Sequence, residues 1–346
     1  MSKDNSIGVI ILAAGKGTRM KSDKPKVCFE LGGKSLVQRV VDTGLKLNAD
    51  LIGVVVGYKN DLVRESIIEH PAIKYILQEE QNGTGHAVIC TKDVFKDFMG
   101  DVFILCGDVP LLRAETLQDM LSKHHKTNAV CTVLTMILDS PDKYGRIVRE
   151  DITSGKVKEI VEFKDASEDI RNIKEINTGI YCFNCSELFN ALSKIDNKNA
   201  QNEYYLTDVI KIFYQENKII ESVLLEDVNE AAGVNSQVQL AELEYEYYQK
   251  INNHWLNNGV TIENPITVQI QEDVKIENDV TICSNCKISG KTLIKKNSFI
   301  GTNSIIENSK LSENTILKGY NIIINVDNAV KNDSKCYNWM EKEINE

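Results

Sequence analysis

The chain has 346 residues, of which 42% are hydrophobic and 26% are charged. These proportions are ordinary for a soluble globular protein, and the length can hold two domains with separate cores. The formal net charge of −10 argues against a nucleic-acid-binding protein, because no basic stripe is available to neutralise phosphates. It does not argue against small phosphorylated substrates, which need only a few local cations.

We expect neither a signal peptide nor a membrane span. The N-terminus, MSKDNS, is polar, and no run approaches the ~20 apolar residues of a membrane span. Nine cysteines, an odd number, predict free thiols in a reducing cytoplasm. The two CxxC pairs, Cys182/Cys185 and Cys283/Cys286, stand too far apart for a zinc ribbon, whose pairs are separated by roughly 15–20 residues. We therefore favour buried or incidental thiols over zinc ligands.

The first part of the chain alternates apolar runs with helical spacing. Residues 7–12 form a near-continuous apolar run, which predicts a strand buried on both faces of a parallel sheet. A helix is predicted over residues 36–49, and further buried strands over residues 51–58, 74–80, 102–108 and 129–138. This alternation predicts a doubly wound α/β domain whose ligand site lies at the C-terminal ends of its strands.

A glycine-rich turn, GKGTR over residues 15–19, follows the first strand. Its glycines let backbone N–H groups close around a phosphate, and Arg19 adds a fixed charge. A dinucleotide fingerprint is disfavoured because Met20 stands at its third position, and the spacing of a Walker A loop is absent. A nucleotidyltransferase loop, which is followed shortly by Pro-Lys, is matched by Pro25-Lys26.

Near the C-terminus, two further periodicities appear. Apolar residues at spacings of three and four predict one long helix between two domains: Leu240, Leu243, Tyr247, Ile251 and Trp255. Seven isoleucines then stand six residues apart: Ile270, Ile276, Ile282, Ile288, Ile294, Ile300 and Ile306. This period predicts a hexapeptide β-helix. Because Ser312 and Lys318 fall on aliphatic positions, we predict that the ladder fails after Ile306 and forms only two to three coils.

Seven blocks, in order, carry a resemblance to a known family: LAAGKGTRMKSDKPKV, QEEQNGTGHAV, GDVPLL, YGRIVRE, INTGIY, NEYYLTD and GVN. With them the chain resembles bacterial N-acetylglucosamine-1-phosphate uridylyltransferases. The resemblance implies a doubly wound, mixed or parallel nucleotidyltransferase domain over residues 1–234 and a linking helix over 235–258. A short left-handed parallel β-helix over 259–325 and a tail or cap over 326–346, formed as a polar helix or a frayed end, complete the expected organisation.

The resemblance implies Mg²⁺-dependent transfer of UMP from UTP to N-acetylglucosamine 1-phosphate, with release of pyrophosphate. The sugar phosphate is already anionic, so positioning and charge neutralisation suffice without a general base. The residues implied to hold uridine and phosphates through their backbone are Leu12, Ala13, Ala14 and Gly15. Those implied to read the uracil are Gln78, Gly83 and Thr84. Those implied to bind the sugar are Gly145, Glu162 and Asn177. The implied charge-neutralising side chains are Arg19 and Lys26, and the implied Mg²⁺ ligands are Asp108 and Asn235.

Each of these residues has a simpler alternative explanation. The glycines of residues 15–19 serve equally as tight-turn residues, and Asp108 as the cap of the next helix. Glu162 stands in a charged stretch that suits solvent, and Asn235 suits the N-cap of the long helix. Arg146 and Arg149 are favoured as surface or ion-pair residues.

Two positions depart from the family pattern beside presumed ligand contacts, Cys106 before Gly107-Asp108 and Phe163 before Lys164. The effect of these two residues on ligand affinity is left open.

Two other functions stay open from the sequence. One is a different sugar-1-phosphate nucleotidyltransferase, with another sugar or base; the other is a non-catalytic nucleotide-sugar sensor. Acyl transfer to an amine needs a base, usually histidine, and no histidine follows His254. We therefore expect no acetyltransferase activity, and a monomer or a weak homo-oligomer through the β-helix.

Overall fold

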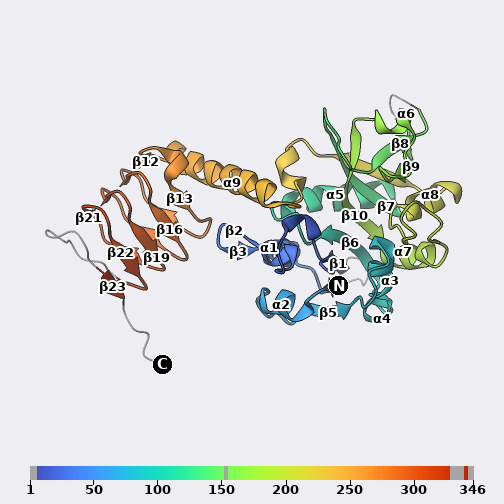
Figure 1. Cartoon of the computed structure of the whole chain (residues 1–346), viewed down its shortest axis with the longest axis horizontal. Coiled ribbons are helices and arrows are strands. Elements are labelled where there is room, and N and C mark those ends of the chain that lie inside the picture. Colours follow the sequence, from blue (N-terminus) through green and yellow to red (C-terminus); the bar gives the residue numbers. More distant parts are fainter. Residues whose placement is uncertain (1–5, 152–154, 328–338, 342–346) are drawn as a thin grey trace. The chain divides into compact units, whose positions relative to one another are not determined.

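The computed structural model describes residues 6–151, 155–327 and 339–341, the last three by their backbone. The chain divides into two compact units (Figure 1). The first comprises Met1–Glu30 and Lys34–Gln237, and the second comprises Leu31–Gly33 and Val238–Glu346. No helix of the described residues is long and apolar enough to cross a membrane.

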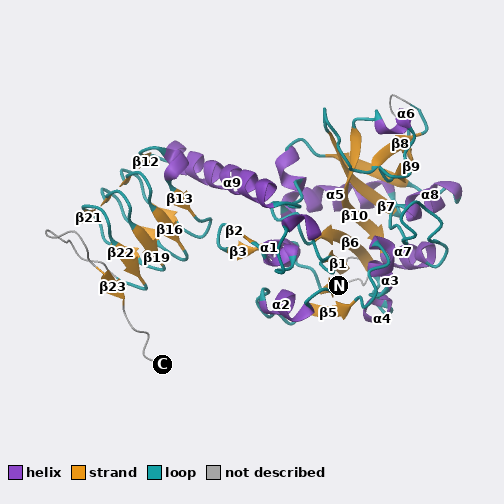
Figure 2. Ribbon diagram, in the orientation of Figure 1, coloured by secondary structure: helices purple, strands orange, loops and turns teal. Residues whose placement is uncertain are grey.

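One mixed sheet organises the first unit, in the order β11-β7-β10-β6-β1-β4-β5, with β8 and β9 joined to β10 (Figure 2). Its strands are β1 (Ser6–Leu12), β4 (Leu51–Val56), β5 (Ile73–Leu77), β6 (Gly100–Cys106), β7 (Cys131–Ile137), β8 (Arg146–Arg149), β9 (Val157–Val161), β10 (Glu175–Asn184) and β11 (Ile220–Leu224). Strand β1 is parallel to β4 and β6, whereas β10 is antiparallel to β6 and β7. The predicted strands are confirmed as β1, β4, β5, β6 and β7.

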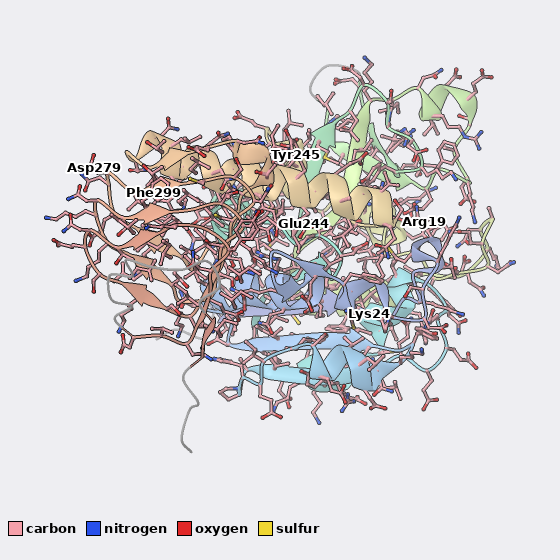
Figure 3. All side chains as sticks on the ribbon, turned by 60° about the vertical axis from the view of Figure 1, so that its left-hand side comes forward. Arg19, Lys24, Glu244, Tyr245, Asp279 and Phe299 are labelled. Atoms are coloured by element: carbon pink, nitrogen blue, oxygen red, sulfur yellow. The ribbon has the colours of Figure 1, made fainter. Side chains whose placement is uncertain are left out.

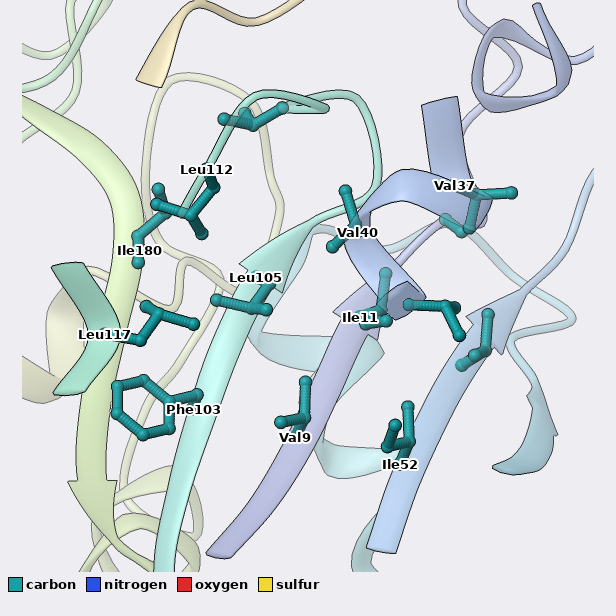
Figure 4. Close-up of a cluster of buried hydrophobic side chains, with 14 of the residues drawn as sticks. Val9, Ile11, Val37, Val40, Ile52, Phe103, Leu105, Leu112, Leu117 and Ile180 are labelled. Atoms are coloured by element: carbon teal, nitrogen blue, oxygen red, sulfur yellow. The ribbon is translucent and has the colours of Figure 1, made fainter. Parts of the chain in front are cut away.

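Helices pack on both faces of this sheet, as expected for a doubly wound fold. The helices of the first unit are α1 (Leu36–Lys46), α2 (Asn60–Glu65), α3 (Thr84–Ile89), α4 (Lys92–Phe95), α5 (Ala114–Thr127), α6 (Glu168–Arg171), α7 (Cys185–Leu192) and α8 (Asp208–Gln215). Val9 and Ile11 of β1 belong to one buried cluster, shared with Val40 of α1 and Leu117 of α5 (Figure 4). Ile10 belongs to the other cluster. Because neighbouring side chains of a strand alternate in direction, β1 is apolar throughout and buried on both faces.

The second unit contains helix α9 (Gln237–Asn257) and three parallel sheets of very short strands. The sheets are β12-β15-β18-β21, β13-β16-β19-β22-β23 and β14-β17-β20. Their bounds are β12 (Thr261–Ile262), β13 (Gln269–Ile270), β14 (Lys275–Ile276), β15 (Thr281–Ile282), β16 (Lys287–Ser289), β17 (Leu293–Ile294), β18 (Phe299–Ile300), β19 (Ile305–Glu307), β20 (Lys310–Leu311), β21 (Ile316–Leu317), β22 (Ile322–Ile324) and β23 (Trp339–Glu341). This is the predicted short left-handed parallel β-helix, with its isoleucines buried inside.

The prediction that the ladder fails after Ile306 is wrong. Ile294 pairs with Leu311, and Ile306 pairs with Ile323, so that each later coil is 17 residues long instead of 18. One residue is missing from the turn after β19, and the aliphatic side chains resume one position earlier, at Leu311, Leu317 and Ile323, all nearly or fully buried. The expected gaps at Ser312 and Lys318 thus come from a shift of register.

The C-terminal residues add one element to the β-helix. Residues 339–341 form strand β23, which pairs with β22 in parallel. The rest of the predicted tail beyond residue 327, residues 328–338 and 342–346, lies outside the described residues.

Asparagine occupies most of the tight corners of the coils. Positive backbone φ angles occur at Asn264, Asp279, Asn285, Asn297, Asn303, Asn308, Asn314, Tyr320 and Asn325. Asn and Asp enter this left-handed conformation more readily than other residues with a side chain. The corners are therefore compatible with the many asparagines of residues 259–325.

We expect Ile300→Ala to destabilise the second unit by about 2 to 5 kcal/mol, because it empties a fully buried site between Ile282 and Leu317. Urea unfolding followed by tryptophan fluorescence measures this, since Trp255 packs against the same core. The matched control is Phe299→Ala, whose side chain points outward and is 38% exposed (Figure 3). Equal losses for the two variants would contradict the inward stacking of Ile300.

Candidate functional site

The glycine-rich turn leaves the C-terminal end of β1, as the sequence predicts. Gly17 has a φ of +67°, and a Cβ atom there would lie 2.4 Å from the Cβ of Lys26. A short 3₁₀ helix, Thr18–Met20, follows, and its last residue, Met20, is buried. Gly17 therefore serves a close approach as well as a turn, because it lets the Lys26 segment pack directly against the loop.

Four predicted polar side chains converge beside this turn. The Lys26 ammonium group donates to the Asp108 carboxylate and, at 2.8 Å, to Asn235 Oδ1. Arg19 Nη2 donates to the same Asn235 oxygen, also at 2.8 Å. Arg19 is largely exposed (Figure 3), whereas the side chains of Lys26 and Asp108 are 16% and 18% exposed. The cations and the candidate metal ligands thus form one cluster.

The geometry of this cluster is compatible with a hard cation. Oxygen atoms of Asp108 and Asn235 already point at one positive group, the Lys26 ammonium. A carboxylate and an amide oxygen, completed by phosphates and water, are ligands that suit Mg²⁺. Within the described residues, no group of three or more His, Cys, Asp or Glu side chains is placed to hold a metal ion. A site with two protein ligands would therefore depend on the substrate for the rest.

A pocket of about 200 Å³ lies next to the cluster, at the C-terminal end of β1. Its lining residues are Leu12, Ala14, Gly15, Gln78, Gln81, Gly83, Thr84, Ala87 and Glu203. Six of them were predicted to contact the nucleotide. Ala13 is buried behind the lining and donates its N–H to Val55 O at 2.9 Å, so it supports the strand end. Gln81, Ala87 and Glu203 were not predicted, although all three stand within the sequence blocks that carry the resemblance.

Hydrogen bonds hold the walls of this pocket. Gln81 Nε2 donates to Ala14 O at 2.9 Å, and Gln78 Nε2 donates to Gly83 O at 3.2 Å. Gly83 has a φ of +101°, and a Cβ there would lie 2.6 Å from Tyr204 O. Gly15 is the opposite case, because a Cβ there would meet nothing within 4 Å. A side chain at position 83 would therefore clash with the pocket wall, whereas the space beside Gly15 is open.

The three residues predicted to bind the sugar also lie together. Asn177 N donates to Gly145 O at 2.9 Å, and a Cβ on Gly145 would lie 3.6 Å from Glu162 Oε2. Asn177 Nδ2 donates to the hydroxyl of Tyr181 at 2.7 Å, which orients the amide. Burial raises the pKa of Glu162; the hydrogen bond from the Thr207 hydroxyl opposes this, and the nearby carboxylates, first Asp165, raise the pKa further.

Cys106, one of the two departures from the family pattern, ends β6 two residues before Asp108. Its thiol donates to Gly179 O at 3.5 Å. Burial raises the pKa of Cys106 to about 12, with Asp108 raising it further and Lys26 opposing. The thiol therefore stays neutral and adds no charge to the site.

The prediction for Arg149 is confirmed, and that for Arg146 is wrong. Arg149 forms an ion pair with Glu175 at 2.6 Å. Arg146 is only 2% exposed and donates to backbone carbonyls, including Arg171 O at 3.1 Å and Asp142 O at 3.0 Å. It therefore holds the loop that precedes Gly145. The second departure, Phe163, stacks against the guanidinium of Arg171, 4.6 Å from the ring centre.

The cysteines of the described residues are free thiols. Burial raises the pKa values of Cys28, Cys90, Cys131, Cys182, Cys185, Cys283 and Cys286, as it does for Cys106. The CxxC pairs are thus packing residues there.

Comparison with known proteins identifies the class of enzyme to which this chain belongs. Residues 8–257 match the nucleotidyl transferase family, and the chain belongs to it. It is 46% identical over 262 residues to the bifunctional protein GlmU of Limosilactobacillus reuteri and 44% identical over 259 residues to that of Syntrophotalea carbinolica. These matches confirm the resemblance predicted from the seven blocks. They cover 76% and 75% of this chain but 56% and 55% of the relatives, so the chain spans about half the length of the curated relatives it matches.

A solved structure shares the fold. A UDP-glucose pyrophosphorylase, solved in complex with UDP-glucose, superposes with a TM-score of 0.55 at 20% identity. The match covers 71% of this chain and 99% of that one.

We expect Gly15→Ala to weaken UTP binding by about tenfold or more, equivalent to about 1.4 kcal/mol, because the added methyl group enters the open pocket. The free energy of unfolding should stay within about 0.5 kcal/mol of the wild type, since no protein atom is displaced. Calorimetric titration with UTP and urea unfolding measure the two quantities. Gly83→Ala is the contrasting variant, which should lose stability as well as binding; unaltered UTP affinity in Gly15→Ala would contradict the assignment of the pocket.

Proposed function

We propose that this chain transfers UMP from UTP to N-acetylglucosamine 1-phosphate, forming UDP-N-acetylglucosamine and pyrophosphate. The observation that carries the proposal is the convergence of Arg19, Lys26, Asp108 and Asn235 beside the glycine-rich turn, whose first residue, Gly15, lines the strand-end pocket. A nucleotidyl transfer site has to neutralise a triphosphate and hold a metal ion at one place, and this cluster offers both kinds of group. Membership of the nucleotidyl transferase family supports the same reaction class.

The pocket is where we place the uridine. Gln78 and the backbone of Gly83 and Thr84 line it and would read the edge of the base, while Leu12, Ala14 and Gly15 would contact the ribose and the first phosphate. Gln78 already donates to Gly83 O, so that both groups are oriented before a ligand arrives. An oriented amide favours a base with matching donors and acceptors over one that leaves them unpaired.

The sugar phosphate would lie on the opposite side of the charged cluster, against Gly145, Glu162 and Asn177. The buried carboxylate of Glu162 would accept hydrogen bonds from sugar hydroxyls, and Asn177 would contact the N-acetyl group. In this placement the anionic phosphate oxygen of the sugar faces the α-phosphorus of UTP. Attack then needs alignment and neutralised charge, and no side chain has to remove a proton.

Asp108 and Asn235 would hold Mg²⁺, which when bound supplies positive charge to the phosphate oxygens. The ammonium of Lys26 and the guanidinium of Arg19 are then available for phosphate oxygens, as both are adjacent to the same ligands. The presence of both cations and of both oxygen ligands argues for catalysis rather than for a non-catalytic sensor.

We further propose that the chain transfers no acetyl group, since no histidine follows His254 in the sequence. We place the enzyme in the cytoplasm, where its buried thiols stay reduced, and expect it as a monomer or a weak homo-oligomer that binds no nucleic acid.

A panel of substrates tests the reaction. With Mg²⁺ and UTP we expect pyrophosphate release with N-acetylglucosamine 1-phosphate. We expect at least tenfold lower kcat/KM with glucose 1-phosphate, because Asn177 would lose the N-acetyl group, and with dTTP, because it lacks the ribose 2′-hydroxyl and carries an extra methyl group on the base. With acetyl-CoA and glucosamine 1-phosphate, no enzyme-dependent thiol release is expected. Equal turnover of glucose 1-phosphate or dTTP would favour another sugar nucleotidyltransferase, and UTP binding without any turnover would favour a sensor.

The pH dependence tests the role of Glu162. Because its pKa is raised, the carboxylate becomes protonated at a higher pH than an ordinary glutamate, whose pKa is about 4.3. The protonated form accepts hydrogen bonds poorly, so KM for the sugar phosphate should rise as the pH falls through this raised pKa. Glu162→Gln should raise KM at neutral pH and remove the part of its pH dependence that Glu162 causes; the remaining part comes from the sugar phosphate, whose second pKa is about 6. A wild-type KM for the sugar phosphate that does not change from pH 8 to pH 4.5 would contradict the assignment; KM for UTP is the internal control.

A further inference from the structure

An ion pair between the buried carboxylate of Glu230 and the half-exposed side chain of Arg113 joins the two loops that carry the oxygen ligands of the charged cluster. Glu230 is 2% exposed and accepts two hydrogen bonds from Arg113, from the backbone N at 2.9 Å and from Nε at 2.8 Å; Nη2 lies 2.7 Å from the same carboxylate oxygen as Nε. Oε1 accepts from the backbone and Oε2 from the guanidinium, so both carboxylate oxygens are engaged and the carboxylate is held in one orientation. The sequence predictions did not include either residue.

The placement of this pair links it to the candidate metal ligands. Arg113 follows Asp108 by five residues in the loop after β6, and Glu230 precedes Asn235 by five residues in the segment after β11. A second connection joins the same two segments, because Val234 N donates to Asp108 O at 2.9 Å. Two contacts therefore connect the loops: the hydrogen bond from Val234 to Asp108, and the ion pair between Arg113 and Glu230.

We propose that Glu230 and Arg113 are positioning residues that set the distance between Asp108 and Asn235, and thereby the affinity of the site for a divalent metal. The inference rests on the proposed function, in which those two residues hold Mg²⁺. Two ligands from separate loops bind one small ion well only if their oxygens are held at the right separation, since Mg²⁺ demands near-ideal geometry. Groups that orient metal ligands typically change metal affinity 10- to 100-fold when they are replaced.

Other contacts hold these loops to the fold without the ion pair. Thr43 Oγ1 donates to Leu112 O at 2.8 Å, and the side chain of Asp227 caps the 3₁₀ helix Val228–Ala231 that contains Glu230. A neutral side chain of the same shape at position 230 should therefore leave the domain folded and loosen only the spacing between the loops. This separates a positioning role from a purely structural one.

The test measures metal binding directly, with Mn²⁺ as the probe. Free Mn²⁺ is followed by electron paramagnetic resonance in the presence of UTP and in the absence of sugar phosphate, using the full chain. The variants are Glu230→Gln, which removes the charge, and Arg113→Lys, which keeps the charge but loses the Nε–H donor. Asp108→Ala serves as the reference for a lost ligand. Glu187→Gln is the matched control, because it breaks the 2.6 Å Lys218–Glu187 ion pair on α7.

We expect Glu230→Gln to weaken Mn²⁺ binding 10- to 100-fold and Arg113→Lys to weaken it less, while Glu187→Gln matches the wild type. The Mg²⁺ concentration for half-maximal activity should rise by the same factor, with kcat recovered at high Mg²⁺. Should Glu230→Gln fail to fold, Arg113→Lys decides alone. Wild-type Mn²⁺ affinity in the folded variants, with binding lost in Asp108→Ala, would overturn this inference and leave the proposed function standing. Undiminished Mn²⁺ binding in Asp108→Ala would instead overturn the metal assignment, and with it this inference.

Discussion

The contact of the Lys26 ammonium with Asp108 and Asn235 is the interaction on which the site depends. Both members of the ion pair are more than four-fifths shielded from water, and a carboxylate in such a place is costly unless a cation or strong donors accompany it. The site therefore has to carry matched charge at every stage: an ammonium in the free protein, or a metal ion and phosphates in a complex. The same groups can exchange partners without leaving a charge unpaired.

The scaffold explains how these groups meet. Strands β1 and β6 are adjacent and parallel, so their C-terminal ends lie at one edge, and Gly107 N donates to Leu12 O at 3.0 Å just before Asp108. Gly17 lacks the Cβ that would push Lys26 away. The last ligand comes from a segment more than a hundred residues further on, and the Val234–Asp108 hydrogen bond brings it in. Backbone contacts at this edge of the sheet thus determine where the reactive side chains lie.

The core of the second unit is built differently, from one small and one aliphatic residue for each short strand. The small side chains, among them Ser304, Ser309 and Thr315, are fully buried and bond to nearby carbonyl groups. Because each corner is an independent tight turn, a residue can be lost at one corner without disturbing the stack. The coils after β19 tolerate the deletion for this reason.

Much of the protein was determined by sequence alone. The apolar runs defined five core strands, the hexads defined the β-helix, and the loop with Pro25-Lys26 indicated the nucleotidyltransferase class, because these features are local patterns. The resumed ladder was also readable, since Ser309, Thr315 and Asn321 stand two residues before Leu311, Leu317 and Ile323; a strict six-residue count hid it. Only the tertiary structure decided that β10 runs antiparallel between β6 and β7, that Arg146 is buried beneath a loop, and that Glu230 meets Arg113. These are pairings between segments distant in the chain, and a single sequence carries no periodic signal for contacts of that kind.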